Sequence, residues 1–170
     1  MFYMLYTVIS GTNRKASNTQ KIAEVYLELL KEKGIEAQLL SLVGLNTLER
    51  TPELESVEKK YLIPAGKFIF IVPEYNGSFP GVLKALMDNS DIQKAWWGKK
   101  ALLTGVSTGR AGNLRGMEHL TGVLHYLKVS VYYDKLPISV VDRLLDQEGK
   151  LTDPATLTVV GKQLDEFIAF

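Results

Sequence analysis

Three short segments of the sequence combine glycine with hydroxyl, amide or charged side chains, and each follows an apolar run. They are residues 10–19 (SGTNRKASNT), 73–81 (PEYNGSFPG) and 107–115 (STGRAGNLR). Glycine lets a backbone approach a ligand closely, and hydroxyl, amide and guanidinium groups donate hydrogen bonds to phosphate oxygens. The three segments together predict a site for a phosphorylated ligand.

The first segment has the composition of a phosphate-binding loop. Thr12, Ser17 and Thr19 carry hydroxyls, and Arg14 adds a cation. Ser17 and Gln20 have the spacing of a capping box that opens a helix. A helix N-terminus offers unpaired N–H groups and partial positive charge to an anion. A plain capped helix is the structural alternative, because Ser and Asn are also favoured there for capping alone.

Two common nucleotide-binding motifs are missing from the chain. Neither G-x-G-x-x-G, the dinucleotide fingerprint, nor G-x-x-x-x-G-K-[ST], the Walker loop, occurs. A phosphate site without either motif indicates a mononucleotide.

The second segment places an aromatic ring beside a constrained backbone. Tyr75 can lie against a flat heterocycle, while the N–H groups of residues 76–78 meet the polar edge of that ring. The third segment again places glycines before a helix. Taken singly, the second reads equally as an ordinary turn and the third as a flexible connection, so the argument depends on all three lying together.

Five apolar runs alternate with helical patterns along the chain. The expected strands are residues 2–9, 35–39, 67–72, 101–106 and 129–133, and the expected helices are 18–33, 52–62, 80–89, 112–127 and 154–168. This alternation predicts one α/β domain over residues 1–170, with a parallel sheet between two helical layers and right-handed crossovers. The second run alternates apolar with polar residues, as an edge strand does, so the predicted order is 2-1-3-4-5. Ligands then bind at the carboxyl ends of strands 1, 3 and 4, where all three segments begin.

The overall composition argues against several classes of function. The 170 residues are 46% hydrophobic and 23% charged, with a net charge of +1, which gives no drive towards nucleic acid or an anionic membrane. There is no cysteine, so thiol chemistry is excluded and redox activity requires a bound cofactor. No apolar stretch is long enough to span a bilayer, and residues 1–9 lack the features of a signal peptide. We expect a cytoplasmic protein.

The three segments resemble the NADPH-dependent FMN reductase family, which includes azoreductase-like and chromate- or quinone-reducing members. The family pattern G-S-x-R-x-x-S-x-[NT] is matched by residues 11–19, with Thr12 in place of Ser. P-E-Y-N-x-S-x-P-G-x-L-K is matched in full by residues 73–84, and S-T-G-x-x-G by residues 107–112. Asn113 departs from the family by replacing a second glycine.

The resemblance implies a flavodoxin-like three-layer sandwich that binds FMN and uses NADPH or NADH as co-substrate. The cofactor-binding residues are then Thr12, Arg14, Ser17, Asn18, Thr19, Pro73, Glu74, Tyr75, Asn76, Gly77, Ser78, Ser107, Gly109 and Arg110. Hydride passes in a ping-pong reaction to flavin N5 and then to a small acceptor: a quinone, an azo compound, free flavin or a metal oxyanion. No side chain is expected to be catalytic, because the flavin carries the chemistry. The family also implies a homodimer or homotetramer.

The sequence also allows other interpretations. A non-enzymatic electron carrier of the flavodoxin type is the main alternative. His119 and His125 are six residues apart, which is not the spacing of a helical metal pair, so no metal site is expected. Arg110 and Arg115 can meet the phosphates of the nicotinamide nucleotide or can simply be surface charge.

Overall fold

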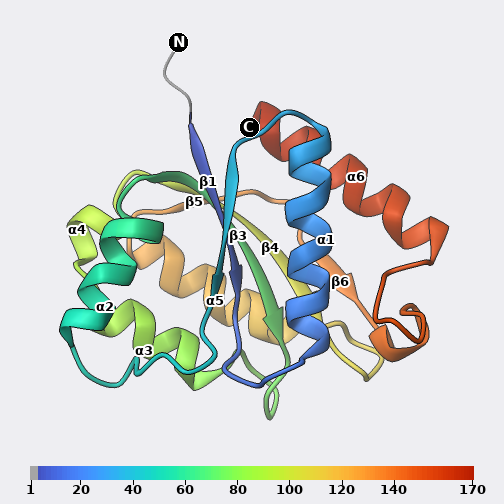
Figure 1. The fold of residues 1–170 in the computed structure, drawn as a ribbon, viewed down its shortest axis with the longest axis horizontal. Helices are drawn as coiled ribbons and strands as arrows, with labels where there is room; N and C mark the ends of the chain where they lie inside the picture. Colours follow the sequence, from blue (N-terminus) through green and yellow to red (C-terminus); the bar gives the residue numbers. More distant parts are fainter. Residues whose placement is uncertain (1–3) are drawn as a thin grey trace.

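The computed structural model describes residues 4–170, which form a parallel sheet between two layers of helices (Figure 1). The strands are β1 (Leu5–Ser10), β2 (Ala37–Ser41), β3 (Ala65–Pro73), β4 (Lys100–Val106), β5 (Ser130–Val131) and β6 (Leu136–Ile138). Their order is β2-β1-β3-β4-β5, and β6 also pairs with β4. Every ladder is parallel. The predicted flavodoxin-like order is therefore confirmed.

Helices cover both faces of the sheet. One face carries α1 (Asn18–Glu32) and α6 (Pro154–Ala169); the other carries α2 (Pro52–Val57), α3 (Gly81–Asn89), α4 (Ile92–Ala95) and α5 (Leu114–Tyr126). A π-helical turn, Glu58–Leu62, continues α2, and a 3-10 turn, Val141–Arg143, follows β6.

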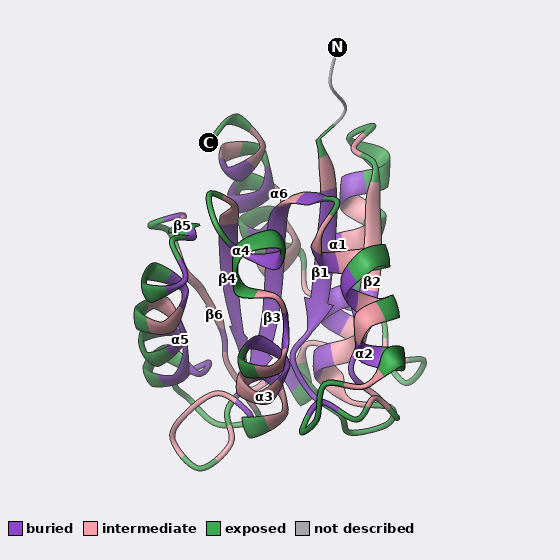
Figure 2. Cartoon of the chain, turned by 90° about the vertical axis from the view of Figure 1, so that its left-hand side faces the viewer, coloured by how far each residue is buried: buried purple, intermediate pink, exposed green. Residues whose placement is uncertain are grey.

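The central strand β3 shows why the sheet is sandwiched. Phe68 and Phe70 point into the core under α3, α4 and α5, whereas Ile69 and Ile71 point into the core under α1 and α6. All four side chains are fully buried. Side chains alternate between the faces of a strand, so an unbroken apolar run needs cover on both sides. Figure 2 shows this buried central layer between partly exposed helices.

The fifth strand differs from the prediction. The expected strand 129–133 shortens to β5, which pairs with Lys100 and Ala101 near the start of β4. The later strand β6 pairs with residues 104–106 at the other end of β4. Between them the chain leaves the ladder, and the Asp134 carbonyl accepts a hydrogen bond from the Gln163 side chain at 2.9 Å. This split brings the segment after β6 to the carboxyl end of the sheet.

Two helices begin later than predicted, for local backbone reasons. Pro80 has ψ of 141° and is the N-cap of α3, so that helix begins at Gly81. Asn113 has φ of 61°, which is left-handed, so α5 begins at Leu114.

The remaining differences are small. The strand expected at residues 35–39 is β2, two residues further on. The short helix α4, capped by the Asp91 carboxylate, was not predicted because four residues carry no readable periodicity. Residues 2 and 3 of the first expected strand lie outside the described residues.

Candidate functional site

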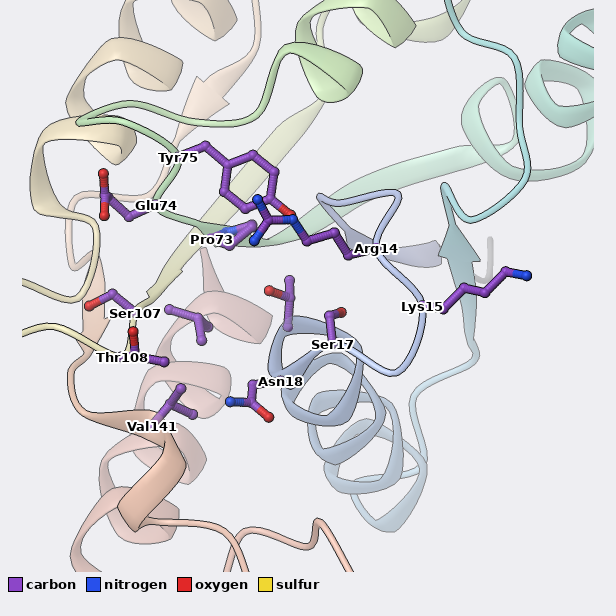
Figure 3. A pocket seen from close by; sticks show the side chains of 12 residues that line it. Arg14, Lys15, Ser17, Asn18, Pro73, Glu74, Tyr75, Ser107, Thr108 and Val141 are labelled. Atoms are coloured by element: carbon purple, nitrogen blue, oxygen red, sulfur yellow. The ribbon is translucent and has the colours of Figure 1, made fainter.

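The three polar segments meet at the carboxyl ends of β1, β3 and β4 and enclose a cavity of about 260 Å³ (Figure 3). For convenience we name the segments loop 1 (residues 11–17), loop 2 (residues 74–80) and loop 3 (residues 107–113). The cavity is lined by Arg14, Lys15, Ser17, Asn18, Thr19, Pro73, Glu74, Tyr75, Val106, Ser107, Thr108 and Val141. The convergence predicted from the strand order is therefore present.

Loop 1 ends in a capped helix that faces this cavity. Ser17 is the N-cap of α1, and its hydroxyl accepts a hydrogen bond from the Gln20 N–H at 3.1 Å. The next N–H groups, those of Asn18 and Thr19, have no acceptor within the helix, and the cap serves neither of them. Together with Arg14 and Lys15, they give this end of the cavity an excess of positive charge and free donors.

Arg14 and Tyr75 connect loop 1 to loop 2. The Arg14 guanidinium carbon is 4.0 Å from the centre of the Tyr75 ring, a cation–π contact in which the guanidinium overlaps the ring in the view of Figure 3. The Tyr75 hydroxyl also pairs with the Thr12 hydroxyl, which is buried and accepts from the Arg14 N–H at 3.2 Å. The two loops are thus held together at the edge of the cavity.

Loop 2 contains a tight turn in which most backbone N–H groups donate hydrogen bonds within the loop itself. Tyr75 and Ser78 exchange backbone hydrogen bonds of 2.8 and 3.2 Å, with positive φ at Asn76 and Gly77 between them. Positive φ at both central residues is the pattern of a type I′ turn. The Gly77 N–H donates to the Glu74 carboxylate. Of the three N–H groups expected to meet a ligand, those of residues 77 and 78 are therefore engaged inside the turn.

Loop 3 is fixed by side chains at both of its ends. The Ser107 hydroxyl donates to the Gly109 carbonyl at 2.9 Å and accepts from the Gly112 N–H at 3.0 Å. The Asn113 amide donates to the carbonyls of Val72 and Pro73 at 3.0 and 2.9 Å, which ties loop 3 to the start of loop 2. Asn113 therefore holds the two loops in register.

A second cavity, of about 340 Å³, adjoins the first and shares Glu74 and Ser107 with it. It is lined by Glu74, Gly77, Ser107, Gly109, Arg110, Ala111, Asn113, Leu114 and Arg115. It lies between loop 2, loop 3 and the start of α5.

The structure brings most of the predicted site residues to these two cavities. The first contains Arg14, Ser17, Asn18, Thr19, Pro73, Glu74, Tyr75 and Ser107, and the second adds Gly77, Gly109 and Arg110. Thr12, Asn76 and Ser78 line neither cavity. The Thr12 hydroxyl supports Tyr75, and the Ser78 hydroxyl is 2.9 Å from His119 Nδ1 on α5.

Sequence reasoning missed several lining residues, for different reasons. Lys15 and Thr108 lie inside the recognised segments, so their positions were available as a signal. Val106 ends a buried strand, and Val141 reaches the cavity only because β6 carries the chain back to the site. No pattern before the structure indicated Val141.

Residues 4–170 contain neither a cluster of metal-binding side chains nor a membrane-spanning helix. Within that range no group of three or more His, Cys, Asp or Glu side chains is placed to hold a metal ion. In the same range, every helix is too short or too polar to cross a bilayer.

The family model and the relatives that match this chain are all named as reductases. The family model described as NADPH-dependent FMN reductase matches residues 4–139. A 2-hydroxy-1,4-benzoquinone reductase from a Burkholderia species is 28% identical over 123 residues, covering 70% of this chain and 67% of the relative. A quinone reductase from Pseudomonas putida is 29% identical over 162 residues, covering 86% of this chain and 83% of the relative.

Solved structures agree at the level of the fold. The flavoenzyme NAD(P)H:(acceptor) oxidoreductase FerB from Paracoccus denitrificans superimposes with a TM-score of 0.81 at 24% identity, covering 98% of this chain and 96% of that one.

Proposed function

Because the chain belongs to the NADPH-dependent FMN reductase family, and so is an oxidoreductase, we propose that it carries FMN in the first cavity and passes hydride from NAD(P)H to a small acceptor. The observation that carries this proposal is the cation-lined cavity at the N-terminus of α1. The proposed order is ping-pong, with the oxidised nucleotide leaving before the acceptor enters.

The donor set of the first cavity fits a phosphorylated flat ring. The free N–H groups of Asn18 and Thr19, with Arg14 and Lys15, suit the phosphate of FMN.

The opposite wall of the cavity suits the ring system. Pro73, Val106 and Val141 offer apolar surface, while Ser107 and Thr108 supply hydroxyls beside it. We place the isoalloxazine and ribityl chain between loops 2 and 3, which leaves the phosphate at α1. The backbone around Gly109, which lines the adjoining second cavity, then remains available to its polar edge.

When bound, FMN accepts hydride at N5 and gives it up again. The chain itself positions the ring, excludes water from one of its faces and stabilises developing negative charge with backbone dipoles. No side chain needs to hold a proton at the reacting atom, so the proposal names no catalytic residue.

A quinone is the acceptor class that we favour. Three of the relatives matched are named as quinone reductases and two as NAD(P)H-dependent FMN reductases, whereas azo compounds and metal oxyanions rest on family resemblance alone. A flat, uncharged quinone can also stack on an exposed ring without a dedicated charged contact.

Two further expectations remain predictions. A homodimer or homotetramer is expected from the family, and exposed apolar side chains on α4 and α5, such as Ile92 and Tyr126, are candidates for its interface. A cytoplasmic location is likewise untested.

Steady-state kinetics test the proposed reaction. The FMN-loaded protein is assayed with NADPH or NADH against a benzoquinone, an azo dye, free FMN and chromate, each at several concentrations. Parallel double-reciprocal lines, with the highest kcat/KM for the quinone, are expected. Intersecting lines contradict the ping-pong order, and no nucleotide oxidation with any acceptor contradicts the reductase assignment and favours an electron carrier.

A further inference from the structure

The second cavity carries a pair of cations that the proposed FMN site does not use. Arg110 and Arg115 line this cavity, whereas Arg14 and Lys15 line the first. Among the residues lining the two cavities, Glu74 is the sole carboxylate. In a chain whose net charge is only +1, this concentration of positive charge marks a surface that attracts anions.

Neither guanidinium is neutralised within the chain. Over residues 4–170, neither guanidinium takes part in an ion pair within 4.0 Å or in a hydrogen bond. The Glu74 carboxylate, the one acidic group that lines this cavity, instead accepts the Gly77 N–H. Both arginines therefore keep all five of their N–H donors available.

Hydrogen bonds fix the backbone that carries Arg110, and the exposed Arg115 side chain lies against loop 2. The Arg110 carbonyl accepts from the Ser139 hydroxyl at 2.7 Å, and the Gly109 carbonyl accepts from the Val140 N–H at 3.0 Å. Arg115 Nη1 lies against loop 2, 3.1 Å from where a Cβ on Gly77 would be. Because Gly77 has no side chain, the guanidinium can occupy that space beside the shared wall of the two cavities.

The single phosphate of FMN accounts for only one of the two cation pairs. FMN has one phosphate, which Arg14, Lys15 and the N-terminus of α1 accommodate in the first cavity. A second, unpartnered cation pair in an adjoining cavity calls for another anionic ligand. The nicotinamide nucleotide is the anionic substrate of the proposed reaction, and it must approach the same ring.

We propose that Arg110 and Arg115 bind the phosphate groups of NAD(P)H in the second cavity, and so guide the reductant onto the flavin. This inference rests on the proposed function. It also moves Arg110 from the predicted FMN contacts to a contact with the co-substrate. The exposed Leu114, on the first turn of α5, supplies apolar surface beside the same two guanidinium groups.

The test compares hydride donors with and without phosphate. Arg110→Gln, Arg115→Gln and the double variant are loaded with FMN and assayed with NADPH, NADH and 1-benzyl-1,4-dihydronicotinamide, which has no phosphate. Losing charge-assisted hydrogen bonds to phosphate should raise KM for NADPH in the double variant by about tenfold or more. The kcat/KM for the benzyl donor should stay within about twofold of wild type, because that donor has no group for these arginines to bind.

Equilibrium binding gives a readout that does not depend on turnover. Isothermal titration of the FMN-loaded proteins with NADP⁺ should show the dissociation constant weakened in parallel with KM, while the dissociation constant for FMN is unchanged. A loss confined to NADPH assigns the pair to the 2′-phosphate, and an equal loss with NADH assigns it to the pyrophosphate; both support the proposal. Lys59→Gln removes one exposed positive charge from the π-helical turn and is the matched charge control.

Three results would overturn the proposal. One is unchanged KM and NADP⁺ affinity in the double variant. Another is an equal loss with the benzyl donor, and the last is an equal loss in Lys59→Gln. If the wild-type protein oxidises none of the donors, the proposed function fails, yet the NADP⁺ titration still decides whether this pair binds the nucleotide.

Discussion

The guanidinium of Arg14 stacks on the ring of Tyr75, with 4.0 Å between the guanidinium carbon and the ring centre. Tyr75 is further anchored through its hydroxyl to that of Thr12, so one aromatic side chain joins loop 1 to loop 2. A change at either residue of this contact should alter both ends of the proposed FMN site.

Arg14→Ala removes the cation next to the proposed phosphate position. The affinity for FMN should fall by about tenfold to a hundredfold, the value of one charge-assisted hydrogen bond in a partly exposed site. Fluorescence titration of the flavin-free protein with FMN measures this. Lys31→Ala, at the opposite end of α1, is the control and should bind normally. Unchanged affinity in both Arg14→Ala and Ser17→Ala would refute the phosphate assignment.

Tyr75→Phe measures the contribution of the hydroxyl to FMN affinity separately from that of the ring. The stack with Arg14 is kept, but the buried Thr12 hydroxyl loses a partner, so FMN affinity should fall only about two- to tenfold, as for one neutral hydrogen bond. Tyr75→Ala also removes the ring and should lower FMN affinity further. The same titration compares them, and equal losses in the two variants would show that the ring contributes nothing.

Asn113 combines a left-handed backbone with two hydrogen bonds that join loops 2 and 3. Asn113→Gly loses the hydrogen bonds but tolerates the positive φ, whereas Asn113→Ala also incurs the left-handed penalty of about 1–2 kcal/mol. Urea unfolding of the flavin-free protein should therefore show both variants destabilised, with alanine lower than glycine by about 1 kcal/mol. Alanine as stable as glycine would contradict this account.

The lowered pKa of Lys99 predicts that the stability of the fold depends on pH. Its ammonium donates to the carbonyls of Leu62 and Ile63 at 2.5 and 2.9 Å, and burial lowers its pKa from 10.5 to about 8. Between these two values the unfolded chain binds a proton that the folded chain does not, so the Lys99 contribution to stability rises with pH.

The corresponding measurement is urea unfolding of wild type and Lys99→Met from pH 7.5 to 10.5. The free-energy difference should shift in favour of wild type as the pH rises above about 8 and should level off as it nears the unfolded-state value. A difference independent of pH would show that the pKa of Lys99 is not lowered.

Most of the architecture was predictable from the sequence. Apolar runs such as residues 67–72 predicted buried strands, and the spacing of Ser17 and Gln20 predicted the start of α1. The site followed from these elements, because parallel strands deliver their following loops to one edge.

What the sequence did not reveal depends on contacts between distant segments. The break between β5 and β6 is accommodated by Gln163, which lies on α6 and reaches the Asp134 carbonyl. The engagement of the Gly77 N–H by Glu74 required the turn geometry itself. For Arg110 and Arg115 the sequence left two interpretations open, contact with nucleotide phosphates and plain surface charge, and only the fold places the two residues in one cavity.

Anaerobic titration of the FMN-loaded protein with NADPH tests whether this chain passes hydride from nicotinamide to a flavin in the first cavity. The account predicts that the visible absorbance of bound FMN is lost in proportion to added NADPH, reaching completion near one equivalent per flavin, and returns on addition of a quinone. A flavin that stays oxidised in excess NADPH, yet is reduced by dithionite, would contradict it.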